Sequence, residues 1–175
     1  MFNDLSSMLS LLKTRRSGRP RDLGDPGPSA QELEQILAIA MRSPDHGKLH
    51  PWRFVHVARD RRDAFAELLQ AAYRIDNPAP GRLEIEANER FARQAPALIV
   101  ALSSPTPGHK IPVWEQELSC GAAGMNLLLA AFGAPPERIA GFIFIGTPAA
   151  ELDERLRPDP GEVVSEWAPP ARKSA

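Results

Sequence analysis

Residues 43–54 of the chain, with the sequence SPDHGKLHPWRF, are the stretch that decides the fold. Pro44 and Pro51 bound a short turn, because proline cannot continue a helix and biases the residue before it toward extended backbone. The aromatic residues after Pro51 favour a strand. We therefore expect a helix that ends at Pro44, then a turn, and then a strand over residues 53–58 with Trp52 as its core anchor.

Helices and strands alternate through the rest of the chain. Ser29 and Glu32 have the spacing of a capping box, which predicts the start of the helix that ends at Pro44. Apolar periodicity predicts further helices over residues 5–14, 60–73, 83–93 and 113–131, and strands over residues 97–102 and 139–145. Strands separated by helices predict an α/β or α+β fold, with a sheet covered by helices.

Composition restricts the possible classes of protein. A chain of 175 residues with 43% hydrophobic content can bury one sizeable core. The net charge of −1 gives no general attraction to nucleic acid or to an anionic membrane. Cys120 is the one cysteine, which excludes an intrachain disulfide and fits a reducing compartment. No apolar run approaches the roughly 18 residues of a membrane helix, so we expect a cytoplasmic protein.

Arg15, Arg16 and Ser17 form the first candidate site. Two guanidinium groups and a hydroxyl at the end of a helix are suited to binding a phosphate in fork geometry. Two arginines at a helix end also complement the negative end of the helix dipole, and this pattern alone leaves both interpretations open. The apolar residues precede the arginines, which is the reverse of the order in a twin-arginine export signal.

The turn is the second candidate site, because basic residues gather there within nine positions. Arg42, His46, Lys48 and His50 have Asp45 as the one nearby acid, which indicates an anionic ligand. His46 and His50 have the spacing of a zinc pair on a helix, but the flanking prolines make a helix there improbable, so we expect no metal site. Each histidine is either a hydrogen-bonded turn residue or a ligand contact.

The remaining motifs add no competing chemistry. There is no dinucleotide-binding glycine motif, no P-loop and no nucleophile elbow, and Cys120 is expected to be a packing residue of the long helix. The small residues 121–124 (GAAG) let another backbone approach closely. We therefore expect a homodimer with an interface above roughly 2,000 Å². Residues 151–175 are polar and proline-rich, and we expect them to form an extended arm on the partner.

Five stretches together resemble the nitroreductase family, and in particular its small bacterial NAD(P)H nitroreductases. They are residues 15–17 (RRS), 43–54, 110–117 (KIPVWEQE), 121–127 (GAAGMNL) and 139–148 (IAGFIFIGTP). The resemblance implies a three-layer α+β fold over residues 1–150, with a central, mainly antiparallel sheet flanked by helices. It also implies a homodimer that binds FMN in clefts at the subunit interface.

The resemblance further implies an FMN-dependent oxidoreductase that takes hydride from NAD(P)H and passes it, by ping-pong transfer, to flat acceptors such as nitroaromatics or quinones. It assigns no catalytic side chain. Lys48 and His50 depart from the family, which often has Asn and Gln there; a lysine at this place can stabilise the anionic reduced flavin. The implied cofactor-binding residues are Arg15, Arg16, Ser17, Arg42, Asp45, His46, Lys48 and His50.

Two other functions stay open from the sequence: an FMN-binding protein without substantial turnover, and a helical module whose arginines bind an acidic partner. A short connection favours the FMN-binding protein without turnover: residues 132–138 (FGAPPER) lead almost directly from the long helix to the closing strand. Roughly two dozen residues of the family pattern are missing there. Either they are deleted or the sequence omits a segment; the intact flanks favour an omission, with a chain break at or near Ala131–Phe132.

Overall fold

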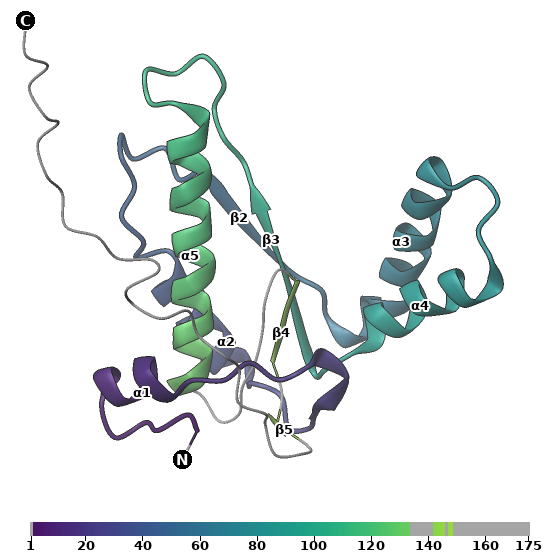
Figure 1. The fold of residues 1–175 in the computed structure, drawn as a ribbon, viewed down its shortest axis with the longest axis horizontal. Helices are drawn as coiled ribbons and strands as arrows, with labels where there is room; N and C mark the ends of the chain where they lie inside the picture. Colours follow the sequence, from purple (N-terminus) through teal and green to yellow (C-terminus); the bar gives the residue numbers. More distant parts are fainter. Residues whose placement is uncertain (1, 134–141, 146, 149–175) are drawn as a thin grey trace, which may run out of the picture.

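The computed structural model describes residues 2–133, 142–145 and 147–148, with side chains through residue 131. At its centre lies an antiparallel sheet of three strands in the order β2-β3-β4 (Figure 1). Two further short strands, β1 and β5, pair antiparallel with each other. The strands are β1 Leu23–Gly24, β2 Trp52–His56, β3 Ala97–Ser103, β4 Phe142–Ile145 and β5 Thr147–Pro148.

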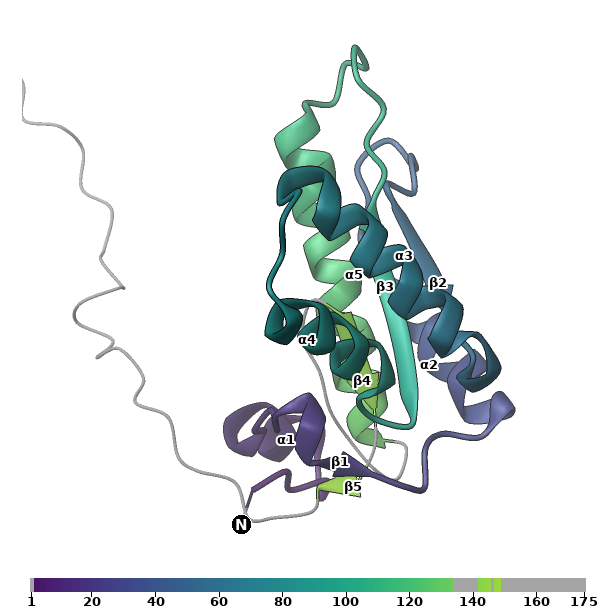
Figure 2. The same cartoon turned by 90° about the vertical axis from the view of Figure 1, so that its right-hand side faces the viewer.

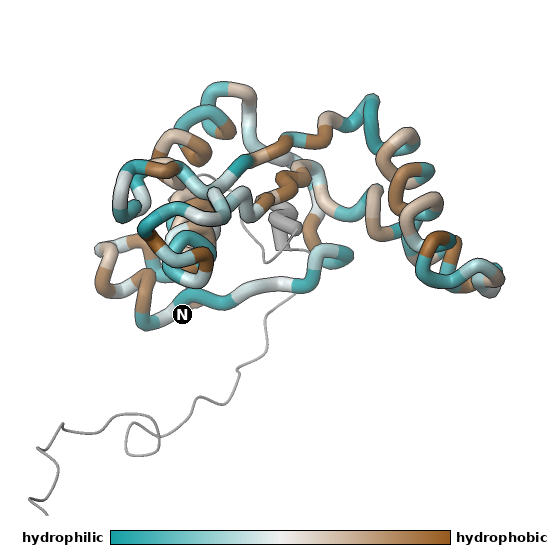
Figure 3. The backbone as a smooth tube through the Cα atoms, turned by 90° about the horizontal axis from the view of Figure 1, so that it is seen from above, coloured by the Kyte–Doolittle hydropathy of each residue, from teal (hydrophilic) through white to brown (hydrophobic). Residues whose placement is uncertain are grey.

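The described residues form five α-helices. Helices α2 and α5 pack on each other, whereas α3 and α4 pack side by side and project away from the rest of the fold (Figures 1 and 3). The helices are α1 Met8–Thr14, α2 Ala30–Ala40, α3 Arg62–Asp76, α4 Arg82–Arg93 and α5 Val113–Gly133. The α+β fold with helices flanking an antiparallel sheet is therefore confirmed.

The core consists of two apolar clusters, one on each face of β3. Ile99 packs on one face with Ile36 of α2 and Leu127 of α5. Leu98 packs on the other face with Leu23 and Val57. Successive side chains of a strand point to opposite faces, so a strand buried on both faces needs an uninterrupted apolar run. That is the pattern from which residues 97–102 were predicted to be a central strand.

Most of the predicted elements are present, with shifted ends. The capping box is confirmed: Ser29 Oγ accepts from the Glu32 backbone N–H at 3.2 Å, and Glu32 Oε2 accepts from the Ser29 N–H at 2.7 Å. The first helix begins later than expected, at Met8, because the Ser7 side chain caps it by accepting from the Ser10 N–H. Leu68 was expected to face inward, but it is exposed on the projecting α3–α4 pair.

The expected chain break is wrong. Helix α5 runs without interruption through Ala131 and Phe132 to Gly133, so the chain is continuous at the junction where the break was expected. Residues 134–141, which follow the helix, lie outside the described residues. The expected arm, residues 151–175, lies outside them as well, and so do residues 139–141 of the expected closing strand.

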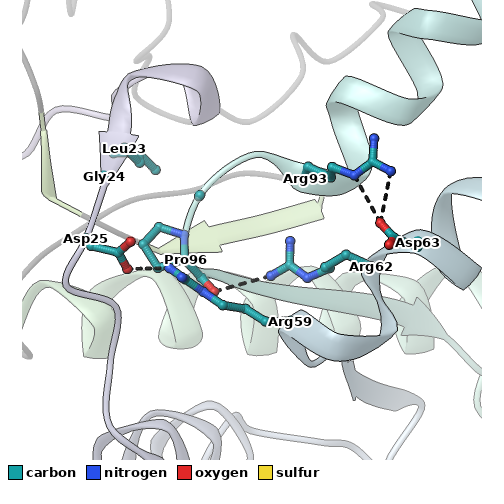
Figure 4. A pocket seen from close by; sticks show the side chains of 9 residues that line it. Leu23, Gly24, Asp25, Arg59, Arg62, Asp63, Arg93 and Pro96 are labelled. Carbon is teal, nitrogen blue, oxygen red and sulfur yellow. Dashed lines mark hydrogen bonds and ion pairs between the residues drawn. The ribbon is translucent and has the colours of Figure 1, made fainter.

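Arg62 attaches the α3–α4 pair to the sheet. Its guanidinium is buried and donates hydrogen bonds to four backbone carbonyls. Figure 4 shows one of them, the bond to Pro96. The acceptors are Val57 O (2.8 Å), Ala92 O (2.8 Å), Gln94 O (3.4 Å) and Pro96 O (3.4 Å). Two of these carbonyls lie at the C-terminal end of α4, where the helix dipole also favours a cation. Burial lowers the pKa of Arg62 from its ordinary value, and the nearby Arg59 lowers it further.

We predict that Arg62→Met lowers the free energy of unfolding by about 3 kcal/mol or more. Methionine keeps most of the apolar stem but leaves two buried and two partly buried carbonyls without a donor, and each fully buried one costs about 1–3 kcal/mol. Urea denaturation measures the change. Arg61→Met is the matched control, because Arg61 is the exposed neighbour and should change stability by less than about 0.5 kcal/mol. Equal effects of the two substitutions would contradict the anchoring role of Arg62.

Candidate functional site

The turn between α2 and β2 is closed by Asp45. Its carboxylate Oδ2 accepts from the His50 backbone N–H at 2.7 Å, and its carbonyl accepts from the Lys48 N–H at 3.4 Å. Gly47, Lys48 and His50 have φ angles of 83°, 54° and 48°, which lie in the left-handed region. That region is open to glycine but disfavoured for Lys and His. The turn thus holds two side chains in a strained backbone, with Asp45 as its internal brace.

His46 contacts an acid that sequence analysis did not assign to the site. Its Nδ1 lies 2.6 Å from Oε1 of Glu115, in the first turn of α5. Asp45 was expected to be the only acid near the basic cluster, and this is wrong, because the fold brings Glu115 to it. The two residues are 69 positions apart, so local spacing gave no signal of the contact.

The loop before α5 supports the turn. Gln116 is only 1% exposed; it donates to the carbonyls of Ile111 (2.9 Å) and Thr106 (3.2 Å) and accepts from the Thr106 N–H (2.8 Å). Ile111, fixed in this way, lies against Gly47: a Cβ placed on Gly47 would be 3.3 Å from Ile111 Cγ1. Glycine at position 47 is therefore needed both for its φ angle and for this close approach.

The basic side chains of the turn are available to a ligand. Arg42, His46, Lys48 and His50 are all exposed. Ser43, at the start of the turn, has a buried hydroxyl that has no hydrogen-bond partner within the part of the chain that the structure describes. Beside the turn lies a cavity of about 590 Å³, which is lined by Leu37, Met41, His50, Trp52, Arg53 and Phe54.

The first candidate cluster follows α1. Arg15 caps the end of the helix and is half-buried, and Ser17 is exposed. Arg16 is 8% exposed, and its guanidinium lies over the Phe2 ring at 4.9 Å from the centroid. Its backbone N–H donates to Asn3 Oδ1 at 2.8 Å. Arg16 thus packs against the N-terminal segment, while Arg15 and Ser17 remain accessible.

One chain does not bring the two clusters together. The turn lies beside the N-terminal end of α5, whereas α1 and the residues after it lie near the opposite end of that helix (Figures 1 and 2). Helix α5 has 21 residues and is therefore about 30 Å long. A single ligand of ordinary size cannot bridge this separation within one chain.

Other parts of the described chain offer less for chemistry. Among the described residues no group of His, Cys, Asp and Glu side chains could hold a metal ion, and no described helix is long and apolar enough to cross a membrane. The Cys120 thiol is partly buried and donates to Leu102 O at 3.7 Å; burial raises the pKa of this thiol, as expected of a packing residue. A pocket beside Arg62 is lined by two acids, Asp25 and Asp63 (Figure 4). Each already forms an ion pair within the pocket, Asp25 with Arg59 and Asp63 with Arg93.

We predict that Lys48→Gly stabilises the protein by about 0.5–1 kcal/mol. Left-handed backbone costs a residue with a Cβ roughly 1–2 kcal/mol, and the larger entropy of unfolded glycine offsets part of the gain. Lys48→Ala is the control, since alanine removes the same charge but keeps the strain and should not stabilise. Urea denaturation compares the two variants. Equal stabilities would show that the turn is not strained at Lys48.

Comparisons with known proteins agree with this architecture. The chain matches the Nitroreductase family over residues 12–147. It is 29% identical to the Escherichia coli K12 protein named "Putative NAD(P)H nitroreductase YdjA", over 90% of this chain and 97% of that protein. A Haemophilus influenzae protein named "Putative NAD(P)H nitroreductase" is 42% identical, over 70% of this chain and 65% of its own length.

Solved structures show the same fold. A nitroreductase-like family protein from Bacillus cereus superposes with a TM-score of 0.68 at 18% identity, covering 93% of this chain and 96% of that one. A nitroreductase-type protein from Exiguobacterium sibiricum, solved in complex with FMN, gives a TM-score of 0.61 at 16% identity, covering 93% and 98%. The family match spans most of the sequence, and the fold agrees with it: the chain belongs to the nitroreductase family.

Proposed function

We propose that the protein is an FMN-dependent oxidoreductase that uses NAD(P)H to reduce flat acceptors such as nitroaromatics or quinones. Membership of the nitroreductase family is the observation that carries the proposal. The names of its relatives, which specify NAD(P)H nitroreductases, and the FMN complex of the Exiguobacterium sibiricum protein support the choice of electron donor and cofactor.

The residues present fit FMN. Arg15 and Ser17 are accessible and supply guanidinium and hydroxyl donors of the kind that a phosphate and its ribityl chain require, while Arg16 lies buried beside them. At the turn, Lys48 and His50 are exposed, and the buried Ser43 hydroxyl has no partner among the described residues, so a ligand can satisfy it. Bound FMN would supply the hydride chemistry between NAD(P)H and the acceptor in a ping-pong cycle, and the basic residues of the turn would tune its potential.

We further propose that each site is shared between two copies of the chain. The arginines and the turn lie at opposite ends of α5, so one subunit's residues 15–17 would meet the partner's turn. Helix α5 also carries an exposed apolar stripe that a second copy can cover: Trp114 is 62% and Leu118 65% exposed, and Gly121 and Ala122 follow on the same face. Leu9 and other apolar residues of α1 are exposed as well.

A second candidate function is FMN binding without substantial turnover. The alignment with YdjA has 182 positions and takes in 90% of the 175 residues, about 158, so about 24 positions have no residue of this chain opposite them. In the family, residues between the long helix and the closing strand help to cover the flavin. We infer that the missing positions fall in the short connection of residues 132–138, which would favour a site that binds the cofactor but protects its reduced form poorly.

The two functions predict different results with purified protein. An oxidoreductase should carry FMN, visible in its absorbance spectrum, and should oxidise NADH or NADPH rapidly once a quinone or nitroaromatic is added. A silent binder would carry FMN without accelerating this oxidation.

Arg15→Ala should weaken FMN binding by about 1.5–3 kcal/mol, the scale of a hydrogen bond to a charged group. Arg15→Lys should weaken it too, because lysine cannot form the two-pronged contact of a guanidinium with a phosphate. Protein that neither carries nor takes up FMN would contradict both functions.

A mixed dimer tests whether the site is shared. Arg15→Ala and Lys48→Glu should each weaken FMN binding in a homodimer, because each damages both sites. A heterodimer of the two variants, isolated by two different affinity tags, should have one intact and one doubly damaged site. It should therefore bind about half as much FMN as the wild type, measured by fluorescence titration.

The heterodimer experiment can also contradict the shared site. If both clusters of a site came from the same chain, each site of the heterodimer would carry one defect, and binding would match that of the parent homodimers. A monomer by light scattering at micromolar concentration would also contradict the shared site.

A further inference from the structure

We propose that Glu115 is a positioning residue for His46 and that it makes Nε2 the imidazole atom that faces the bound ligand; this rests on the proposed FMN site. The 2.6 Å contact between His46 Nδ1 and Glu115 Oε1 links the turn directly to α5. It joins a residue of the candidate site to a helix that is itself held in the core by Leu127. The acid lies outside the set of residues that the sequence assigned to the site.

The hydrogen bond determines which nitrogen of His46 carries the proton. An ionised carboxylate can only accept hydrogen bonds, so the hydrogen between the two groups belongs to Nδ1. In the neutral ring, Nε2 then has no proton and accepts a hydrogen bond; in the charged ring it donates one. Glu115 therefore sets both the direction in which the ring points and the polarity of the atom presented to a ligand.

The pair is not needed to hold the turn in place. Other contacts do this: the Asp45 carboxylate closes the turn, and Ile111, fixed by the buried Gln116, supports Gly47. The side chain of His46 is 63% exposed and that of Glu115 31% exposed. Ion pairs with this exposure contribute little to the free energy of unfolding. The effect of losing Glu115 should thus fall on the imidazole and its ligand, not on the fold.

The chain contains a matched control two residues away. Glu117 lies on the same turn of α5, is exposed, and carries the same charge. Residues two apart on a helix do not share a face, so Glu117 does not point toward His46. Glu117→Ala removes one negative charge near the turn without removing the acceptor of His46. Glu115→Gln is the conservative variant, because its amide oxygen can still accept from Nδ1.

Two measurements on the full-length protein test the proposal. Nitrogen-15 NMR of the FMN-free protein reports the tautomer of neutral His46: the wild type, Glu115→Gln and Glu117→Ala should hold the proton on Nδ1, whereas Glu115→Ala should lose this preference. Fluorescence titration with FMN should then show binding about three- to tenfold weaker for Glu115→Ala, and within about twofold of the wild type for Glu117→Ala. His46→Ala combined with Glu115→Ala should be no weaker than His46→Ala alone.

An unchanged tautomer in Glu115→Ala would overturn the proposal, and so would a changed tautomer with FMN affinity equal to that of Glu117→Ala. An additive double variant would also overturn it, because Glu115 would then act independently of His46. If the wild-type protein does not bind FMN, the proposed function fails separately, and the NMR comparison decides the positioning role by itself.

Discussion

The packing of α5 against β3 and α2 is the interaction on which the rest of the structure depends. Leu127 and Ala131 of α5 are fully buried with Ile99 of β3 and Ile36 of α2. Burying a side chain as large as leucine or isoleucine contributes roughly 1.5–3 kcal/mol, so this contact fixes the long helix firmly. Because α5 is rigid, its two ends have definite positions, with Glu115 and the turn at one end and α1 near the other.

The turn combines a fixed backbone with exposed side chains. Asp45 holds the shape of the turn by accepting a hydrogen bond from the His50 N–H. Gly47 lets the turn lie close to Ile111 in the loop that precedes α5. Lys48 and His50 adopt left-handed backbone angles although glycine would adopt them at lower cost. Basic side chains at strained backbone positions are typical of binding sites, and the turn is therefore placed at the centre of the proposed site.

The short connection after α5 and the exposed apolar stripe bear on the same question, namely how the proposed site is covered. A family member that lacks about 24 alignment positions has less of its own chain with which to shield a cofactor from water. The exposed Trp114 and Leu118 on α5 provide a surface for a second copy, whose presence would supply part of the missing enclosure. In the proposed dimer, turnover would depend on the second copy, because that copy would help to exclude solvent from the bound cofactor.

The sequence by itself determined the elements and the family. The apolar run of β3, the capping box of Ser29 and the proline-bounded turn are local patterns, and each produced the expected structure because backbone geometry is set by near neighbours. It also indicated which basic residues form the candidate site. It did not reveal that Arg62 anchors the α3–α4 pair, that Glu115 meets His46, or that residues 15–17 lie far from the turn. These depend on contacts between segments distant in the chain, and only the packing of helices on the sheet brings such segments together or holds them apart.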